Sequence, residues 1–247
     1  MIKIKTEQEI VLMRKACEIT RDTLLMLEKN IKPGVTTKEL DKLAYDFIKK
    51  NNAKPGFLHY GGFPASICAS VNNEVVHGIP SDRVLKEGDI ISIDVGAKYK
   101  GYNGDSARTF PVGKISDEKQ KLIDVTKQSF FEGIKGIKAG CKVGDISSQV
   151  QRYVEKNGFS VVRDLVGHGV GKELHEDPMV PNFGFAGLGP KLQANTIIAI
   201  EPMVNAGDYK VKTDKVNNWT VYTSDGSDSA HYENTVLITE DGVEILT

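Results

Sequence analysis

The sequence predicts a fold of the α+β class that is built from two similar halves. Three observations lead to this prediction: two helices open with capping boxes, short β-branched runs indicate buried strands, and a 22-residue segment recurs later in the chain. The 247 residues can bury a sizeable core. We therefore expect one domain, residues 1–247, with halves of about 1–112 and 113–247.

Each of the first two helices is predicted by a box of the form T-x-x-E. The first box, at 6–9, is followed by apolar residues at approximately helical spacing up to Asn30. The sequence IKPG then ends this helix. The second box, at 36–39, opens an amphipathic helix that runs to about Asn51.

An aspartate stands inside the isoleucine-rich run EGDIISIDV, residues 87–95. The run is typical of a buried strand, and a carboxylate taken out of water needs a partner, so Asp94 requires one. Asp105 follows in NGDSARTF, and the glycines and polar residues of 98–104 lie between the two acids. These residues predict a hairpin that brings both carboxylates to one place.

A weak internal repeat relates the two halves. Residues 31–52 align without gaps on residues 137–158, and five of the 22 positions are identical. The run at 87–95 corresponds to residues 193–202 in the second half. The motif VVHGIP, residues 75–80, corresponds to VGHGVG, residues 166–171. Because the segments recur in the same order, we interpret the chain as a duplication in which each half gives two helices and several strands.

The repeat pairs Asp94 with Glu201 and Asp105 with Glu233. For Asp105 and Glu233 alone, a solvated turn or an ion pair is the better interpretation. Asp94 and Glu201 instead end β-branched runs that hold no lysine or arginine. Gathered carboxylates raise one another's pKa unless cations keep them ionised. With His168, the four acids form an oxygen-rich donor set that suits two Mn²⁺, Fe²⁺, Co²⁺ or Zn²⁺ ions about 3.5–4 Å apart.

Three of the five histidines lie in informative contexts. His168 stands between two glycines, which permits either close backbone approach or a tight turn. His175 follows seven residues later, and His77 lies between a strand-like run and a proline. These two are candidate catalytic groups or turn caps. His59 and His231 have no spacing argument, so a surface or satisfied imidazole is the better interpretation of each.

The composition excludes several classes of protein. A net charge of −1 argues against a generic nucleic-acid surface, and three widely spaced cysteines argue against a disulfide framework. There is no apolar run long enough for a membrane span, no signal core, no G-x-S-x-G elbow, no Walker loop and no H-E-x-x-H helix. We therefore expect a protein of the reducing cytoplasm without nucleic-acid or membrane partners.

Taken together, the motifs resemble the metal-dependent aminopeptidases of the pita-bread fold, specifically the type 1 methionine aminopeptidases. The resemblance covers almost the whole chain, and its most specific parts are NEVVHGIP, IDVGAKYKGYNGDSARTF, GHGVGKELHEDP, IAIEPM and YENTVLIT. It implies a curved antiparallel sheet backed by two helix pairs with internal pseudo-twofold symmetry. It also implies a dinuclear metal site whose ligands are Asp94, Asp105, His168, Glu201 and Glu233, with Asp105 and Glu233 bridging.

The activity implied by this resemblance is removal of the initiator methionine from nascent proteins when the second residue is small. A metal-activated water would attack the scissile amide, with Glu201 as proton shuttle and with His77 and His175 stabilising and positioning the reacting groups. The methionine side chain would enter an apolar pocket whose candidate wall is Tyr60, Phe63, Cys68, Leu174 and Trp219. We expect a monomer that acts on peptides beginning with methionine, with transient ribosome association.

Three positions depart from the family pattern. Val76 replaces a frequent cysteine, Asn234 a frequent histidine, and Leu174 a frequent aromatic residue, which bears on inhibitor response and pocket shape. Two rival interpretations remain. A proline-specific aminopeptidase or prolidase would share the five ligands, although such relatives usually carry a further N-terminal domain. A binding protein that has lost its metals is the second rival, although all five ligands are present.

Overall fold

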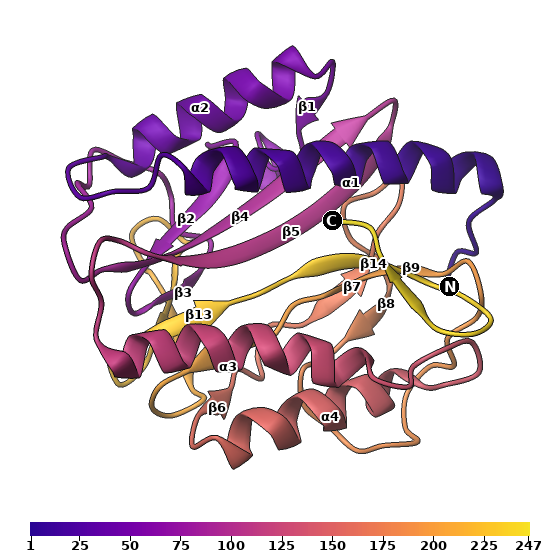
Figure 1. The fold of residues 1–247 in the computed structure, drawn as a ribbon. Coiled ribbons are helices and arrows are strands. Elements are labelled where there is room, and N and C mark those ends of the chain that lie inside the picture. The colour runs from indigo at the N-terminus through magenta and orange to yellow at the C-terminus, as the bar shows by residue number, and fades with distance from the viewer.

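The computed structural model describes all residues from 1 to 247 as four α-helices and a set of antiparallel strands (Figure 1). The helices are α1 (Glu7–Glu28), α2 (Thr37–Lys50), α3 (Asp117–Ile134) and α4 (Val143–Lys156), and a 3₁₀ turn spans Tyr60–Gly62. The strands are β1 (Lys54–Pro55), β2 (Ile67–Val71), β3 (Glu74–Val76), β4 (Ile90–Tyr99), β5 (Tyr102–Pro111), β6 (Ser160–Val161), β7 (Gly167–Gly169), β8 (Glu176–Val180), β9 (Ile197–Ile200), β10 (Met203–Asn205), β11 (Val211–Thr213), β12 (Val221–Thr223), β13 (Ser229–His231), β14 (Asn234–Ile238) and β15 (Val243–Ile245).

Both predicted capping boxes are present. The Thr6 hydroxyl accepts a hydrogen bond from the backbone N–H of Glu9, whose carboxylate accepts one from the backbone N–H of Thr6, at 3.3 and 3.0 Å. The second box opens α2 in the same way. Since the side chains satisfy N–H groups that have no partner within the helix, they fix where each helix begins. The helices α2 and α4 have 14 residues each and start at Thr37 and Val143, which keeps the 106-residue offset of the repeat (143 − 37).

The predicted hairpin is the antiparallel pair β4 and β5, joined by a two-residue turn. Lys100 and Gly101 occupy the turn with φ of 47° and 90°, the left-handed conformation that a type I′ turn requires at both positions. Asp94 lies opposite Ala107, two residues along β5 from Asp105. Since side chains alternate between the faces of a strand, the two carboxylates project from the same face.

The strands form two larger sheets, each covered by a pair of helices. One sheet has the order β1, β4, β2, and β5 also pairs with β4. The other sheet has the order β15, β14, β9, β7, β8. In Figure 1, α1 and α2 lie over the first sheet and α3 and α4 over the second. Two three-stranded sheets complete the fold, in the orders β13, β10, β6 and β11, β12, β3. This antiparallel, helix-backed arrangement matches the predicted class.

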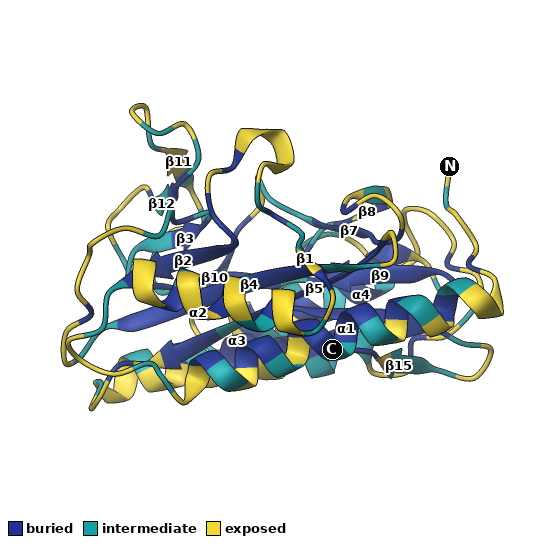
Figure 2. Cartoon of the chain, turned by 90° about the horizontal axis from the view of Figure 1, so that it is seen from above, coloured by how far each residue is buried: buried dark blue, intermediate teal, exposed yellow.

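Separate apolar clusters lie beneath the two helix pairs. One includes Leu24, Leu40, Ile93 and Phe110 between the first helices and their sheet, and the other joins α3 and α4 to residues such as Ile198. Figure 2 shows that the strands are mostly buried while each helix exposes one face, and that the β11–β12 hairpin projects from the side opposite α1 and α3. The side of the sheets away from the helices is therefore left to loops.

Candidate active site

The predicted site residues line one cavity of about 220 Å³. Its wall holds the four acids, the three candidate histidines and all five residues expected to form the methionine pocket: Asp94, Asp105, Glu201, Glu233, His77, His168, His175, Tyr60, Phe63, Cys68, Leu174 and Trp219. A larger groove of about 630 Å³ elsewhere contains a single acid, Asp177, and no histidine. Since the chemistry needs titratable and metal-binding groups, the smaller cavity is the candidate active site.

The acids reach the cavity from two hairpin-like strand pairs. Asp94 and Asp105 come from β4 and β5. Glu201 follows the end of β9 and Glu233 precedes β14, directly beyond the paired residues Ile200 and Asn234. Two strand pairs distant in sequence thus present two carboxylates each to the same place.

Backbone hydrogen bonds join the two strand pairs at the acids. The N–H of Glu233 donates to the carbonyl of Ala107 at 2.9 Å, and Ala107 is the residue opposite Asp94. Thr235 exchanges two bonds with Asp105: its hydroxyl accepts from the Asp105 N–H at 3.0 Å and donates to the Asp105 carbonyl at 2.7 Å. The relative position of the acids is therefore set by one main-chain hydrogen bond and by the two bonds of the Thr235 hydroxyl, all of them between the two halves.

His168 lies in the middle of β7 and offers one ring nitrogen to the acids. Its Nδ1 lies 2.9 Å from the carbonyl of Gly169; with the proton on Nδ1 this is a hydrogen bond that leaves the lone pair of Nε2 free. Nε2 lies 3.7 Å from Asp105 Oδ2 and 3.6 Å from Glu201 Oε1. The flanking glycines permitted either a tight turn or a close approach of the backbone, and the structure shows an extended strand with close approach. A Cβ at Gly167 would lie only 2.4 Å from the carbonyl oxygen of Ala199.

The donor set fits a divalent metal ion. One oxygen of each of Asp94, Asp105 and Glu233 is buried without any hydrogen-bond partner, and such an oxygen is costly unless a cation binds it. Ligand atoms of Asp105, His168 and Glu233 all lie within 4.8 Å of one another. Carboxylate oxygens with one imidazole nitrogen are a typical first-row transition-metal donor set.

Without a cation, the buried acids would not stay ionised together. Burial and the neighbouring carboxylates raise the pKa of Asp94 and Glu233 well above the usual range. Burial raises the pKa of Asp105 to about 7, and burial together with Asp105 raises that of Glu201 well above the usual range. Burial likewise lowers the pKa of His168 to about 3, which keeps this imidazole neutral and able to bind metal.

His77 and His175 lie on the same cavity, beside the acids. The ring of His175 lies 4.1 Å from that of His168 between centroids, and its Nδ1 is 2.8 Å from the Tyr60 hydroxyl. His77 has φ of 58° and lies 6.3 Å from the Trp219 ring. Burial, with His175 nearby, lowers the pKa of His77 to about 4, so this imidazole is neutral at neutral pH.

Apolar residues close the cavity next to these histidines. The rings of Phe63 and Trp219 meet edge to face with centroids 5.2 Å apart. Phe63, Cys68 and Leu174 belong to one small apolar cluster, against which Trp219 packs. Burial raises the pKa of the Cys68 thiol well above its usual value, so Cys68 contributes an uncharged surface. The cavity thus joins a polar, metal-binding floor to an apolar wall.

His231 was missed by the sequence interpretation, which favoured a surface or satisfied imidazole. It is 2% exposed, and its Nε2 is buried without a hydrogen-bond partner, 3.8 Å from Glu201 Oε2. The signal available in the sequence was its place in HYEN, two residues before Glu233, a spacing that puts two side chains on the same side of an extended segment. Burial lowers its pKa to about 3.

Asn234, one of the departures from the family pattern, supports the half-buried guanidinium of Arg108. Its Oδ1 accepts a hydrogen bond from Arg108 at 2.6 Å, and Arg108 also donates to the carbonyl of Glu233. The guanidinium stacks on the Tyr232 ring at 4.1 Å. The Arg108 guanidinium therefore links β5 to the segment that carries Glu233, and Asn234 accepts one of its hydrogen bonds.

A model of the family described as "Metallopeptidase family M24" matches residues 11–240. The chain therefore belongs to metallopeptidase family M24. None of its four helices combines the length and the apolar character that a membrane crossing needs.

Within that family, the chain is similar to bacterial methionine aminopeptidases. The chain is 61% identical to the methionine aminopeptidase of Clostridium acetobutylicum, over 100% of this chain and 99% of the relative. The crystal structure of the methionine aminopeptidase from Rickettsia prowazekii superposes with a TM-score of 0.98 at 44% identity, covering both chains completely. The prolidase from Pyrococcus furiosus shares the fold with a TM-score of 0.81 but only 26% identity, and the chain covers 65% of its length.

Proposed function

We propose that this chain hydrolyses the peptide bond after an N-terminal methionine when the second residue is small. The observation that carries the proposal is the position of the apolar wall around Phe63 and Trp219, directly beside a cluster of four carboxylates and an imidazole. The methionine aminopeptidases named above share the fold over the whole chain, whereas the prolidase is less similar and longer. All proposed ligands come from one chain, which supports a monomeric enzyme. Transient association with the ribosome would bring it to nascent chains.

Five residues would hold two divalent ions, with Mn²⁺, Fe²⁺, Co²⁺ and Zn²⁺ as candidates. Asp105 and Glu233, each with one buried oxygen that has no hydrogen-bond partner, would be shared by the two ions, and both offer a ligand atom near one of His168. Asp94, His168 and Glu201 would complete the donor set. When bound, the ions supply Lewis acidity that lowers the pKa of water and polarises a carbonyl group.

Glu201 is the proposed proton shuttle. Its carboxylate accepts a proton from the attacking water and returns it to the nitrogen of the leaving amine. Nε2 of the neutral His168 lies 3.6 Å from Glu201 Oε1, and Nε2 of the neutral His231 lies 3.8 Å from Glu201 Oε2. Each carboxylate oxygen therefore has an imidazole beside it. In the metal-free protein, burial and the neighbouring Asp105 raise the pKa of this carboxyl well above its usual range.

His175 and His77 are proposed to stabilise and position the scissile amide. When the Tyr60 hydroxyl donates to Nδ1 of His175, the proton of that ring lies on Nε2, where it can donate to a developing oxyanion. His77 is neutral and borders Trp219, between the acids and the apolar wall. His175 would thus donate a hydrogen bond to the carbonyl oxygen, and His77 would orient the scissile amide.

The proposal is tested with peptides on protein stripped of metal by a chelator and then supplied separately with Mn²⁺, Fe²⁺, Co²⁺ or Zn²⁺. We expect methionine release from Met-Ala-Ser, little from Met-Leu-Ser, and no cleavage of Gly-Pro. Release of glycine alone would move the chain to the proline-specific branch. Inactivity with every metal would favour a binding protein on this fold.

Trp219 gives a prediction about the pocket. Replacing it with alanine removes the ring that packs against Phe63, and we expect kcat/KM for Met-Ala-Ser to fall by about tenfold or more, since each 1.4 kcal/mol of lost contact is a factor of ten. Trp219→Phe keeps an aromatic surface and serves as the matched control. An unchanged kcat/KM in a folded Trp219→Ala variant would remove Trp219 from the pocket.

A further inference from the structure

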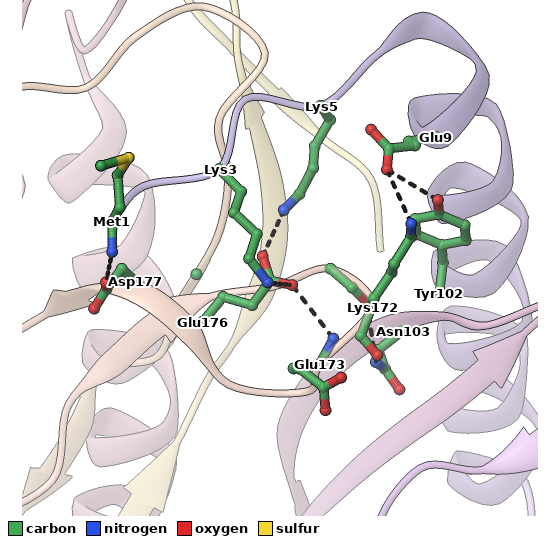
Figure 3. A network of polar contacts seen from close by, with 12 residues as sticks. Met1, Lys3, Lys5, Glu9, Tyr102, Asn103, Lys172, Glu173, Glu176 and Asp177 are labelled. Carbon is green, nitrogen blue, oxygen red and sulfur yellow. Dashed lines mark hydrogen bonds and ion pairs between the residues drawn. The ribbon is translucent and has the colours of Figure 1, made fainter.

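A buried ion pair lies outside the catalytic cluster and is not used by the proposed reaction. Lys5 Nζ lies 2.6 Å from Glu176 Oε2, and the two side chains are 6% and 3% exposed (Figure 3). Lysine is almost never this buried unless it is paired, and the desolvation of both charges offsets most of their attraction. Stability alone is therefore a weak explanation for the pair.

The pair closes the turn that carries His175. Glu176 is the next residue, and its Oε1 accepts a hydrogen bond from the backbone N–H of Glu173 at 3.3 Å. A Cβ at Gly171 would lie 2.6 Å from both Lys5 Nζ and Glu176 Oε1, so the pair packs directly on the start of the same turn. We call residues 171–177 the His175 loop; it also presents Leu174 to the cavity.

Lys5 is itself anchored to the sheet that carries two of the acids. Its backbone N–H donates to the carbonyl of Asn195 at 2.9 Å, and the N–H of Asn195 donates to the carbonyl of Ile238 at the end of β14. The position of Lys5 is thus tied to β9 and β14, which lead to Glu201 and Glu233.

The first sheet fixes the other side of the His175 loop. The Asn103 amide donates to the carbonyls of Gly171 and Lys172, both at 3.0 Å, and the Asn103 N–H donates to Gly171 at 2.9 Å. Asn103 lies in β5, two residues before Asp105. The loop is therefore held between the two strand pairs that supply the acids.

We propose that Lys5 and Glu176 are positioning residues that act through His175. The pair keeps the His175 ring against His168 and the Tyr60 hydroxyl, at the separations of 4.1 and 2.8 Å given above. Loss of the Lys5 charge leaves the Glu176 carboxylate buried without its closest partner, and the loop moves to hydrate it. This inference rests on the proposed function, because it assigns His175 a part in that reaction.

The test compares Lys5→Met with Lys3→Met. Lys3 pairs with the same carboxylate at 3.0 Å, but it is 58% exposed, so Lys3→Met is a matched control. We expect Lys5→Met to lower kcat for Met-Ala-Ser by about 10- to 100-fold, as small displacements of a reacting group do, with KM changed less. Lys3→Met should stay within about twofold, since exposed pairs contribute little. Lys5→Arg, which keeps the charge, should restore most of kcat.

A double-mutant cycle distinguishes positioning from a general effect on the fold. In a His175→Ala background, Lys5→Met should have almost no further effect on kcat, because the group it positions is gone. Effects that multiply would overturn the proposal. If Lys5→Met does not fold, Glu176→Gln is used in the same cycle.

The last readout is independent of activity. In the folded, metal-free protein, the ring resonances of His175 in NMR spectra should shift in Lys5→Met, while those of His231 should stay in place. Unchanged His175 resonances would overturn the proposal. A wild-type chain that releases no methionine, but whose His175 signals respond to Lys5→Met, would contradict the proposed function and leave the positioning contact standing.

Discussion

Replacement of Glu201 with glutamine is expected to lower kcat for methionine release by about 10³-fold, within the range that general acid–base groups contribute. Glutamine keeps the shape of the side chain but cannot accept the proton of the attacking water. It also removes one negative charge from a donor set in which buried carboxylates face each other. The measurement is steady-state hydrolysis of Met-Ala-Ser at saturating metal.

Metal content separates the two roles proposed for Glu201. If Glu201→Gln retains its metal after dialysis and loses kcat, the lost function is proton transfer. If the metal is lost as well, coordination accounts for at least part of the effect. Glu240→Gln changes an exposed acid just beyond β14 and should behave as wild type. A Glu201 variant within about tenfold of wild type would contradict both roles.

Metal-free protein is expected to become less stable as the pH rises from about 6.5 to 8. Burial raises the folded pKa of Asp105 to about 7, against about 3.9 in an unfolded chain. The native state then holds a proton that the unfolded chain releases, so this contribution is present at low pH and is lost as the pH rises through the folded pKa. Each proton that the native state still holds changes the free energy of unfolding by about 1.4 kcal/mol per pH unit. The slope from Asp105 fades above about pH 7, and the further decrease comes from Asp94, Glu201 and Glu233, whose pKa values are also raised well above the usual range.

The buried histidines act in the opposite direction, but at lower pH. Burial lowers the folded pKa of His77 to about 4 and those of His168 and His231 to about 3, against about 6.5 when unfolded. Protonation of the unfolded chain therefore destabilises the native state below about pH 6.5. Above that pH these histidines are neutral in both states and give no slope.

The melting temperature of chelator-treated protein at pH 6.5 and 8 measures this effect. Adding divalent metal should raise the melting temperature more at pH 8, because the ion replaces the protons that the carboxylates otherwise share. Asp94→Asn removes one of the carboxylates and should flatten the pH dependence. A metal-free melting temperature that does not change between these pH values would contradict the assignment.

The sequence was sufficient to predict the elements with strong local signals. The capping boxes at Thr6 and Thr36 define where α1 and α2 begin, and the turn at Lys100 and Gly101 accounts for the pairing of β4 with β5. Asp94 could be recognised because a carboxylate at the end of a β-branched run needs a partner. The repeat then indicated the second pair of acids.

Contacts between distant segments could not be predicted in the same way. His231 looked ordinary because nothing beside it in the sequence shows that its Nε2 reaches Glu201. Lys5 and Glu176 are separated by 171 residues, and each would be a typical surface residue if judged alone. Their burial depends on the packing of the first residues of the chain beside Asn195 and the segment that carries Glu176, which no local pattern encodes.

The hydrogen bonds between Asp105 and Thr235 have a consequence for the order of folding. They join residues 130 positions apart, so the chain must close a very long loop before these contacts, and the acid cluster beside them, can form. We therefore expect the metal-binding groups to come together late in folding. An ion that binds only the completed cluster is then expected to slow unfolding and to leave the rate of folding almost unchanged.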